Sequence, residues 1–437
     1  MIHLVPIFGM NIPGSEPHIA MVLPFILTLL SIAVFPLFAP DWWAKHYPKV
    51  IFCLSLPTLI YYLLILQLPM PIVHVLEEYF SFIALIGSLF VISGNIHIEV
   101  KGGSKPTANC IFLLTGAILA NVIGTTGASM LLIRPWIRMN HYRITAFHIV
   151  FFIFIVSNVG GCLTPIGDPP LFLGYLAGIP FWWIFSHALP GWTYTLLALL
   201  IVFYFIDRHN YHRAPLPVQE EKTHSETWKI TGWHNGFWLL VVLGAVFLDK
   251  PYGLREGLMI AASLGSYYTT SASIRIRNEF NFHPIIEVAV LFIGIFTTMV
   301  PALALLQAHA SALHIQSPIQ FYFASGILSA FLDNAPTYLT FLMAAMGIHD
   351  LDPSSPSNFT SLANTFPSTV LAISMGAVFF GALTYIGNGP NFMVRAIAEH
   401  AKVRMPSFAG YIFRYSLPIL APILTLVGFL LFWGKNQ

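Results

Sequence analysis

Long, continuous apolar segments dominate the chain, and four of them are interrupted by glycine, proline, aspartate or asparagine. Apolar residues make up 57% of the sequence and charged residues only 9%, against roughly 25% charged residues in soluble domains. A run of about 20 apolar residues crosses a bilayer as a helix, and these runs do not alternate every second residue as lipid-facing strands do. The sequence therefore predicts an all-α polytopic membrane protein with about 10–11 transmembrane helices.

Apolar spans are expected at about residues 20–39, 50–69, 79–97, 146–179, 190–206, 237–248 with 257–274, 284–305, 366–394 and 415–434. Two further apolar segments, 110–137 and 319–347, contain Gly-Thr-Thr-Gly at 124–127 and Asp-Asn-Ala-Pro at 333–336. Because such residues break helices, each segment is expected to form a re-entrant hairpin that enters and leaves the same face of the membrane.

A long polar stretch at 207–235 divides the chain into an N-terminal transmembrane half, 1–206, and a C-terminal half, 236–437. The histidines of this linker do not have the spacing of a metal site. Lysine and arginine in the short loops mark the cytoplasmic side. They predict a cytoplasmic linker, a periplasmic N-terminus and insertion in a bacterial inner membrane. The first hairpin then enters from the cytoplasm and the second from outside.

Three blocks of the first half recur in the same order in the second half. ALIGSLF at 84–90 resembles LFIGIFT at 291–297, and the breaks of LANVIGTTGA at 119–128 and LSAFLDNAPT at 328–337 coincide. LTPIGDPPLF at 163–172 aligns without gaps on LTYIGNGPNF at 383–392. Loop charges give the two members of each pair opposite orientations. The sequence therefore predicts two inverted-topology repeats, each with a hairpin and an unwound helix, at about 157–174 and 377–394.

The breaks are the expected site of chemistry. A helix broken at membrane depth frees backbone groups that must face protein, water or a bound ion. Half-helix N-termini favour anions, and unwound carbonyl groups can bind cations. Asp168 and Asp333 lie in two breaks, and Asn388 takes the place of Asp168 in the second repeat. A carboxylate there favours either a proton or a bound cation, so we expect sodium at Asp168, Asp333 and Asn334, in one central site with two carboxylates.

The candidate ion- or substrate-binding residues carry oxygen ligands or sit at a freed backbone group: Asp168, Asp333, Asn334, Thr337, Thr125, Thr126, Thr164, Gly167, Thr384, Gly387, Asn388, Ser157 and Asn158. The expected helix-breaking residues are Gly124, Gly127, Pro165, Pro169, Pro170, Pro336, Gly389 and Pro390. The alternative is that the aspartates and asparagines cap helices, that the threonines bond their own backbone, and that Ser157 and Asn158 make interhelical hydrogen bonds.

The strings SNVGGCLTPIGDPPLFLG at 157–174, SAFLDNAPTYLTF at 329–341 and YIGNGPNF at 385–392 resemble the ion transporter superfamily. This superfamily includes sodium/proton antiporters, arsenite permeases, citrate–metal transporters and divalent-anion/sodium symporters. Asp-Asn-x-Pro at 333–336 is most similar to the antiporter branch, whereas the symporter branch has Ser-Asn-Thr at both hairpin tips. The resemblance implies a homodimer and an elevator-like movement of the part that contains the hairpins.

The leading hypothesis from the sequence is sodium (or lithium)/proton antiport through Asp168 and Asp333. The alternative is cation-coupled transport of citrate or another small carboxylate or oxyanion. An intramembrane aspartyl protease is the least favoured reading, since its two aspartates must share a proton. We expect a transporter rather than an enzyme, without a cofactor, whose partners are lipid, the transported ion or carboxylate, and sodium or protons. The net charge of +2 offers no footprint for nucleic acid.

Overall fold

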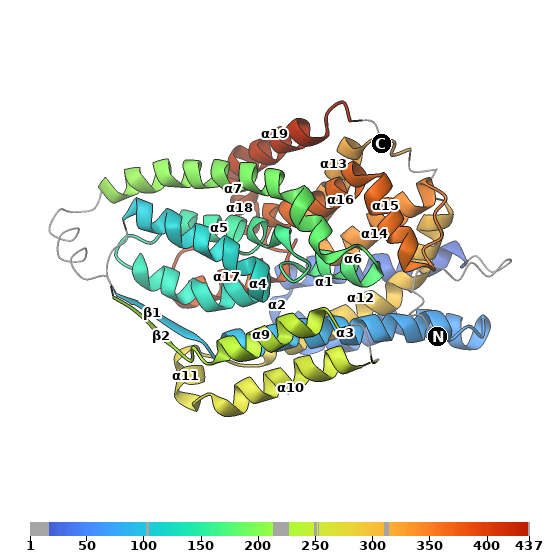
Figure 1. Ribbon diagram of the computed structural model, residues 1–437, viewed down its shortest axis with the longest axis horizontal. Coiled ribbons are helices and arrows are strands. Elements are labelled where there is room, and N and C mark those ends of the chain that lie inside the picture. Colours follow the sequence, from blue (N-terminus) through green and yellow to red (C-terminus); the bar gives the residue numbers. More distant parts are fainter. Residues whose placement is uncertain are drawn as a thin grey trace.

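The computed structural model describes residues 17–101, 105–212, 227–248, 251, 253–309 and 314–435. Its helices form two layers, seen below and above the middle of Figure 1. We call the lower one the scaffold layer. It contains η1 (Ile19–Val22), α1 (Leu23–Phe38), α2 (Pro40–Ile60), η2 (Tyr61–Ile65), α3 (Met70–Gly94), α9 (Asn235–Val246), α10 (Leu254–Thr269), α11 (Ala272–Arg277) and α12 (His283–Ala308).

The second layer holds both hairpins and both unwound helices, and we call it the hairpin layer. Its N-terminal part contains α4 (Pro106–Met139), α5 (Ala146–Ile155), η3 (Val159–Leu163), α6 (Pro169–Ala177) and α7 (Phe181–His212). Its C-terminal part contains α13 (Pro318–Phe331), α14 (Asn334–Ile348), α15 (Pro356–Thr365), α16 (Pro367–Phe380), η5 (Gly381–Leu383), α17 (Gly389–His400), α18 (Phe408–Tyr411), η6 (Ile412–Leu420) and α19 (Ala421–Phe432).

The architecture confirms the all-α polytopic class. Within the described residues, eight helices are long and apolar enough to cross a bilayer, and α15 with α16 and η5 makes a ninth candidate that is bent by 100°. This number is smaller than the expected 10–11. The difference arises because several apolar segments are short pieces: α9 and α10 have 12 and 16 residues, and the arms α13 and α14 have 14 and 15.

Both expected hairpins are present. α4 consists of two helical arms and turns back between them at Gly124, whose φ of 77° and ψ of 155° no helix contains. Asn109 and Asn140, near its two ends, bond to each other through their amides at 2.8 and 3.2 Å, so both ends lie on one side. In the second hairpin, α13 and α14 meet at Leu332 and Asp333. The hairpins approach the centre from opposite halves of the molecule (Figure 1).

The unwound helices occupy the centre of the hairpin layer. α5 and α16 are buried along their whole described length, apart from the ends. Each is followed by a short 3₁₀ turn, η3 or η5, an extended break, and a new helix, α6 or α17. α4 packs on η3 of its own repeat and on α17 of the other, and α14 packs on α16 of its own repeat and on α6 of the other. This reciprocal packing places all four breaks together.

The first helices of the two repeats, α3 and α12, pack antiparallel in the scaffold layer. Tyr79 contacts Phe296 and Phe82 contacts Phe292, with ring centroids 5.9 and 4.8 Å apart. Farther along α3, Gly87 lies near Ile285. Equivalent helices that run in opposite directions are what an inverted repeat requires.

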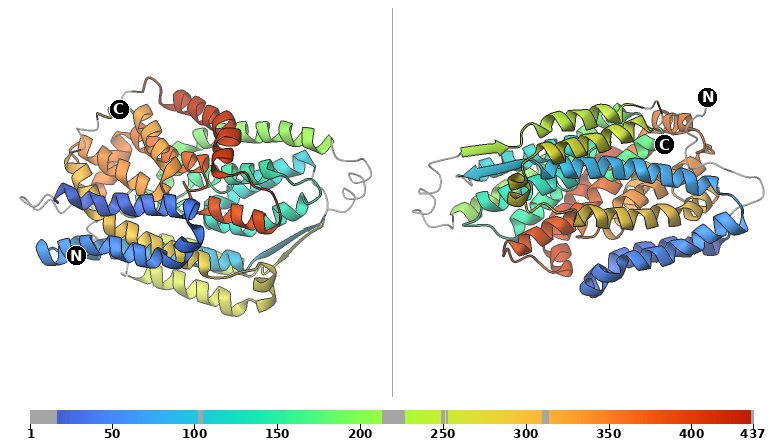
Figure 2. Two further views of the ribbon diagram at one scale, coloured as in Figure 1. Left: turned by 180° about the vertical axis from the view of Figure 1, so that it is seen from behind. Right: turned by 90° about the horizontal axis from the view of Figure 1, so that it is seen from below.

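The polar linker expected at 207–235 is shorter in the structure. α7 continues through residues 207–212, and β2 (Thr227–Thr231) pairs antiparallel with β1 (His97–Lys101) in a two-stranded ribbon. The residues between them lie outside the described part. The polar composition of residues 207–212 suggests that they are exposed to solvent. Asp207 is nevertheless fully buried, among residues that are distant in sequence. The ribbon lies at one end of the molecule, where the chain passes between the two layers (Figures 1 and 2).

Candidate functional site

The carboxylate of Asp168 is the meeting point of the four breaks. It lies directly before α6, is 1% exposed, and accepts hydrogen bonds from three side chains. Thr125 Oγ1 at the tip of the first hairpin donates at 2.7 Å, Asn334 Nδ2 at the tip of the second at 2.5 Å, and Asn388 Nδ2 in the second unwound helix at 3.1 Å. Each donor comes from a different break, so the fold converges on this one carboxylate.

The hydrogen bonds repeat the internal symmetry of the sequence. Thr125 and Asn334 occupy equivalent positions in the aligned hairpins, and both donate to Asp168. The next equivalent pair is Thr164 and Thr384. Thr164 Oγ1 donates to the backbone oxygen of Asn121 at 2.6 Å, and Thr384 Oγ1 donates to that of Ala330 at 2.5 Å. These threonines brace each break against its own hairpin rather than contact Asp168.

Other expected residues support Asn388 and Thr125. Asn388 Nδ2 lies 3.1 Å from the backbone oxygen of Ser157 and 3.3 Å from Oδ1 of Asn158. The backbone oxygen of Gly167 accepts from the N–H of Thr125 at 2.8 Å. The alternative raised for Asn158, an interhelical hydrogen bond, is also present, since its Nδ2 donates to Asn391 Oδ1 at 2.7 Å.

Three expected residues are engaged locally. Thr337 Oγ1 donates to the backbone oxygen of Asp333 at 2.9 Å, which is the back-bond to its own helix that the sequence left open. Gly387 packs against Gly381. The equivalent residues of the first repeat, Gly167 and Gly161, are in contact in the same way. Gly127 is inside the second arm of α4 and packs near Ser93, so it is not itself the point of the break.

The other helix breakers stand where helices begin or end. Pro169 and Pro170 open α6, Gly389 and Pro390 open α17, and Pro336 is the third residue of α14. Pro165 lies in the extended segment between η3 and α6.

Asp333 has two roles in the geometry. Its carboxylate accepts from the N–H of Ala335 at 3.1 Å and so caps α14. It also lines a cleft with Thr126, Pro169, Asn388 and Gly389. Asp168 lines an adjoining cavity that shares Thr126 and Pro169 with this cleft. The two aspartates therefore face neighbouring spaces. A protease pair that shares a proton would need a hydrogen bond between its two carboxyl groups, and within its described residues the structure records none between these two.

The cleft lies between the two layers. The breaks form its polar wall, and the scaffold forms its apolar wall, with Ile86 and Phe90 on α3 and Pro284, Ile285, Val288 and Phe292 on α12. A polar patch that faces an apolar wall is the usual composition of a small-molecule site. A Cβ atom at Gly389 would meet no heavy atom within 4 Å, so this position opens onto free space in the cleft.

Some of the oxygen atoms that were expected to bind sodium already accept hydrogen bonds. Asp168 is already bonded to three donors, whereas Oδ1 of Asn334 is buried and has no hydrogen-bond partner. No group of three His, Cys, Asp or Glu side chains suited to a metal ion occurs in the portion of the chain that the structure describes. Sodium at Asp168, Asp333 and Asn334 stays a prediction.

Sequence reasoning missed two asparagines that hold the breaks together. Asn121 donates to the backbone oxygen of Gly160 at 2.6 Å and accepts from the N–H of Leu163 at 2.8 Å. Asn391 donates to the backbone oxygens of Gly381 and Thr384 at 2.8 and 3.0 Å. Asn391 belongs to the aligned string LTYIGNGPNF, where it replaces a leucine of the first repeat. That polar-for-apolar difference between the two repeats was the available signal.

Comparison with known proteins identifies one family. The family described as "Putative citrate transport" matches residues 14–432, which is nearly the whole chain. No curated protein matches the chain.

Proposed function

Because the chain belongs to the family described as "Putative citrate transport", we propose that it is a secondary transporter that moves citrate or a closely related small carboxylate together with a cation. The substrate occupies the cleft between the scaffold layer and the breaks, and the cation occupies the cavity at Asp168. The sequence alone placed sodium/proton antiport first, and the family match reverses that order.

The observation that carries the proposal is the convergence of four half-helix N-termini on one cleft. Thr126 is at the start of the second arm of α4, Pro169 starts α6, Asp333 caps α14, and Gly389 starts α17, and all four line the cleft. A helix N-terminus carries a partial positive charge from its aligned peptide dipoles. Four such ends favour an anion, and an oxygen-rich anion such as citrate matches them.

A cation at Asp168 would complement the anion. Asp168 supplies a buried carboxyl group that is negatively charged once its proton is released, and the unpaired Oδ1 of Asn334 is a further oxygen ligand beside it. Hard cations such as sodium prefer oxygen ligands. A bound cation would also offset the cost of the buried carboxylate and allow an anion to enter the neighbouring cleft.

Sodium/proton antiport is the second candidate, because two carboxylates, Asp168 and Asp333, face adjoining cavities whose lining contains no lysine or arginine among the described residues. In this mechanism the carboxylates exchange a proton for sodium, and no organic anion is needed.

One preparation of proteoliposomes separates the two candidates. Radiolabelled citrate should accumulate in response to an inward sodium or proton gradient, and Asp168→Asn should abolish the accumulation. If instead no di- or tricarboxylate accumulates under any cation gradient, while added sodium dissipates a preset pH gradient, the carboxylate proposal is wrong and antiport replaces it.

A further inference from the structure

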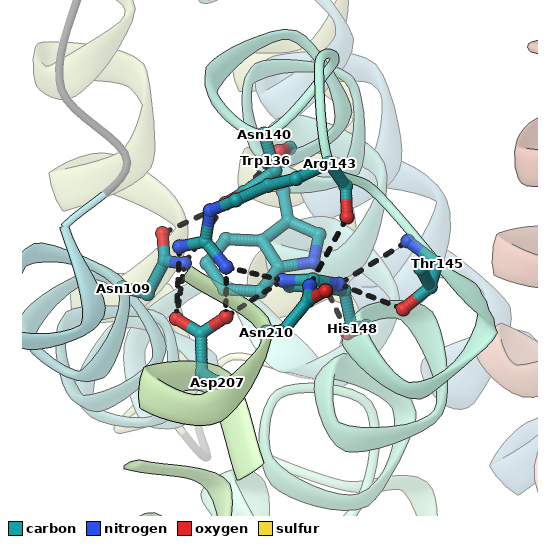
Figure 3. A network of polar contacts seen from close by, with 8 residues as sticks. All are labelled: Asn109, Trp136, Asn140, Arg143, Thr145, His148, Asp207 and Asn210. Carbon is teal, nitrogen blue, oxygen red and sulfur yellow. Dashed lines mark hydrogen bonds and ion pairs between the residues drawn. The ribbon is translucent and has the colours of Figure 1, made fainter. Parts of the chain in front are cut away.

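A buried cluster at the base of the first hairpin ties this hairpin to its neighbours (Figure 3). It contains Asn109 and Asn140 from the two ends of the hairpin, Arg143 from the following loop, His148 on α5 and Asp207 on α7. We call these five residues the hairpin clamp. They lie far along the helix arms from the tip residue Thr125, since each arm has about 15 residues at 1.5 Å each.

Asp207 is the centre of the clamp. Its side chain is fully buried and forms two contacts with the guanidinium of Arg143, the second at 3.0 Å. Asn109 Nδ2 donates to the same carboxylate at 2.8 Å. His148 Nδ1 accepts from the N–H of Thr145 at 3.2 Å, so Nε2 carries the hydrogen that it donates to Asp207 Oδ1 at 3.0 Å.

These contacts connect four chain segments to α7. Asn109 links Asp207 to the first arm of the hairpin and, through the reciprocal amide bonds with Asn140, to the second arm. Trp136 Nε1 adds a bond at 3.1 Å from the second arm to the backbone oxygen of His148. Both arms, the loop and α5 are therefore fastened to α7 through one carboxylate.

The second hairpin is built differently at its base. The position equivalent to Asn140 is His349, whose ring stacks on Phe366 with centroids 3.6 Å apart and an interplanar angle of 12°. Within residues 317–366 the structure records no ion pair. Two stacked rings can slide past each other at little cost. Separating a buried ion pair is costly, because each charge is then left buried without its counter-charge.

We propose that Asp207 is a positioning residue of the transport site. By fixing both arms of the first hairpin to α5 and α7, it keeps Thr125 and Thr126 in place at the Asp168 cavity. The arms of the second hairpin separate more readily, so opening of the site falls to the second hairpin. The inference rests on the proposed function for its link to transport, but the clamp itself can be tested without any substrate.

Two buried serines, one in each hairpin, can report hairpin opening because they contact equivalent residues of the two repeats. Ser129 of the first hairpin bonds to Ser157 at 2.8 Å, and Ser329 of the second bonds to the backbone oxygen of Ala377 at 2.6 Å. Residues 157 and 377 are equivalent in the repeat alignment, and both serines are fully buried. Each Ser→Cys variant, in a background with Cys53, Cys110 and Cys162 replaced by alanine, reacts with a thiol reagent only when its hairpin opens.

The labelling rates of purified protein without citrate test the clamp. Ser129→Cys should react more slowly than Ser329→Cys. Adding Asp207→Asn should accelerate labelling of Ser129→Cys at least about tenfold, because Arg143 is left buried without its counter-charge. Adding Arg143→Gln to Asp207→Asn should restore slow labelling. Glu256→Gln, which removes a buried partner of Arg255 in the scaffold layer, is the matched control and should leave the rate unchanged.

Transport separates positioning from a purely structural role. In proteoliposomes, Asp207→Asn should raise the KM for citrate several-fold in folded protein, and the double variant with Arg143→Gln should recover it. Equal rates for the two reporters with native Asp207, no acceleration by Asp207→Asn, or equal acceleration by Glu256→Gln would each overturn the proposal. If Asp207→Asn does not fold, the labelling rates of Ser129→Cys and Ser329→Cys with native Asp207 still test the proposal. If the labelling rates are as expected but the protein transports no citrate, the role of the hairpin clamp is supported and only the proposed substrate is wrong.

Discussion

At the scale of single residues, Asp168 and Asp333 show how one residue type takes different roles. Asp168 is closed off by donors from three breaks, whereas Asp333 is half-buried, caps α14 and lines the open cleft. A carboxylate with three donors and no exposure is held in one position. Asp168 is therefore the fixed charge around which the site is built.

Replacing that charge should stop transport. In Asp168→Asn, an NH2 group replaces one of the two acceptor oxygens and faces either the donor of Asn334 or the donors of Thr125 and Asn388, and the negative charge that holds a cation is lost. We expect citrate uptake to fall by about 100-fold or more, since losing a charged hydrogen-bond partner costs about 3 kcal/mol. Glu287→Gln, on α12 but outside the cleft lining, is the control and should retain uptake. Normal uptake by Asp168→Asn would show that the substrate does not use this site.

Gly389 is expected to control the size of the cleft. An alanine there projects into open space, so folding is unaffected while the cleft narrows beside Asn388. We expect Gly389→Ala to raise the KM for citrate about tenfold, because one methyl group in a fitted pocket is worth roughly 1–3 kcal/mol. Gly244→Ala on α9, where a Cβ also meets nothing, should leave the KM unchanged. An unaltered KM in Gly389→Ala would place the substrate elsewhere.

At the scale of elements, two glycines on either side of the break are in contact in each unwound helix. A Cβ at Gly387 would lie 2.5 Å from the backbone oxygen of Ser329 and 2.7 Å from that of Gly381. Such contacts require the backbone to shift, so Gly387→Ala should lower the free energy of unfolding by about 1–3 kcal/mol. Thermal unfolding in detergent measures this against Gly389→Ala, only two residues away, which should unfold near the native temperature. Equal stability of the two variants would contradict the packing of the break.

The elements also show which features the sequence can reveal. Glycine, proline and polar residues inside apolar runs mark all four breaks, because such residues have few other reasons to occur there. The partners of each break are set by three-dimensional packing, so the donation of Asn388 to Asp168 had no local signal. Asp207 was expected in a solvated linker because its neighbours are polar, but Arg143, 64 residues earlier, compensates its burial.

At the scale of the whole molecule, the cleft separates two layers that the chain joins at few places. α3 leads to the hairpin layer through β1, and β2 leads back from it to α9. A substrate held between two layers can reach both sides of the membrane if one layer moves past the other. The resemblance of the sequence to the ion transporter superfamily implies the same movement.

A cross-link across the cleft should therefore stop transport. Ile86 of the scaffold layer and Met393 of the hairpin layer line it from opposite sides. In a cysteine-free background, Ile86→Cys combined with Met393→Cys should lose most citrate uptake after treatment with a cleavable bifunctional thiol reagent, and cleavage should restore it. Each single variant, treated in the same way, reports the effect of modification alone. Full uptake by the cross-linked protein would show that the layers do not move relative to each other.

The central claim is that four breaks, related by an inverted repeat, form one substrate site and not two. Isothermal titration of citrate into the purified protein, in the presence of sodium, tests it most directly. We predict one citrate per chain, with binding abolished by Asp168→Asn and weakened by Gly389→Ala. Two citrates per chain, or binding that survives Asp168→Asn unchanged, would contradict it.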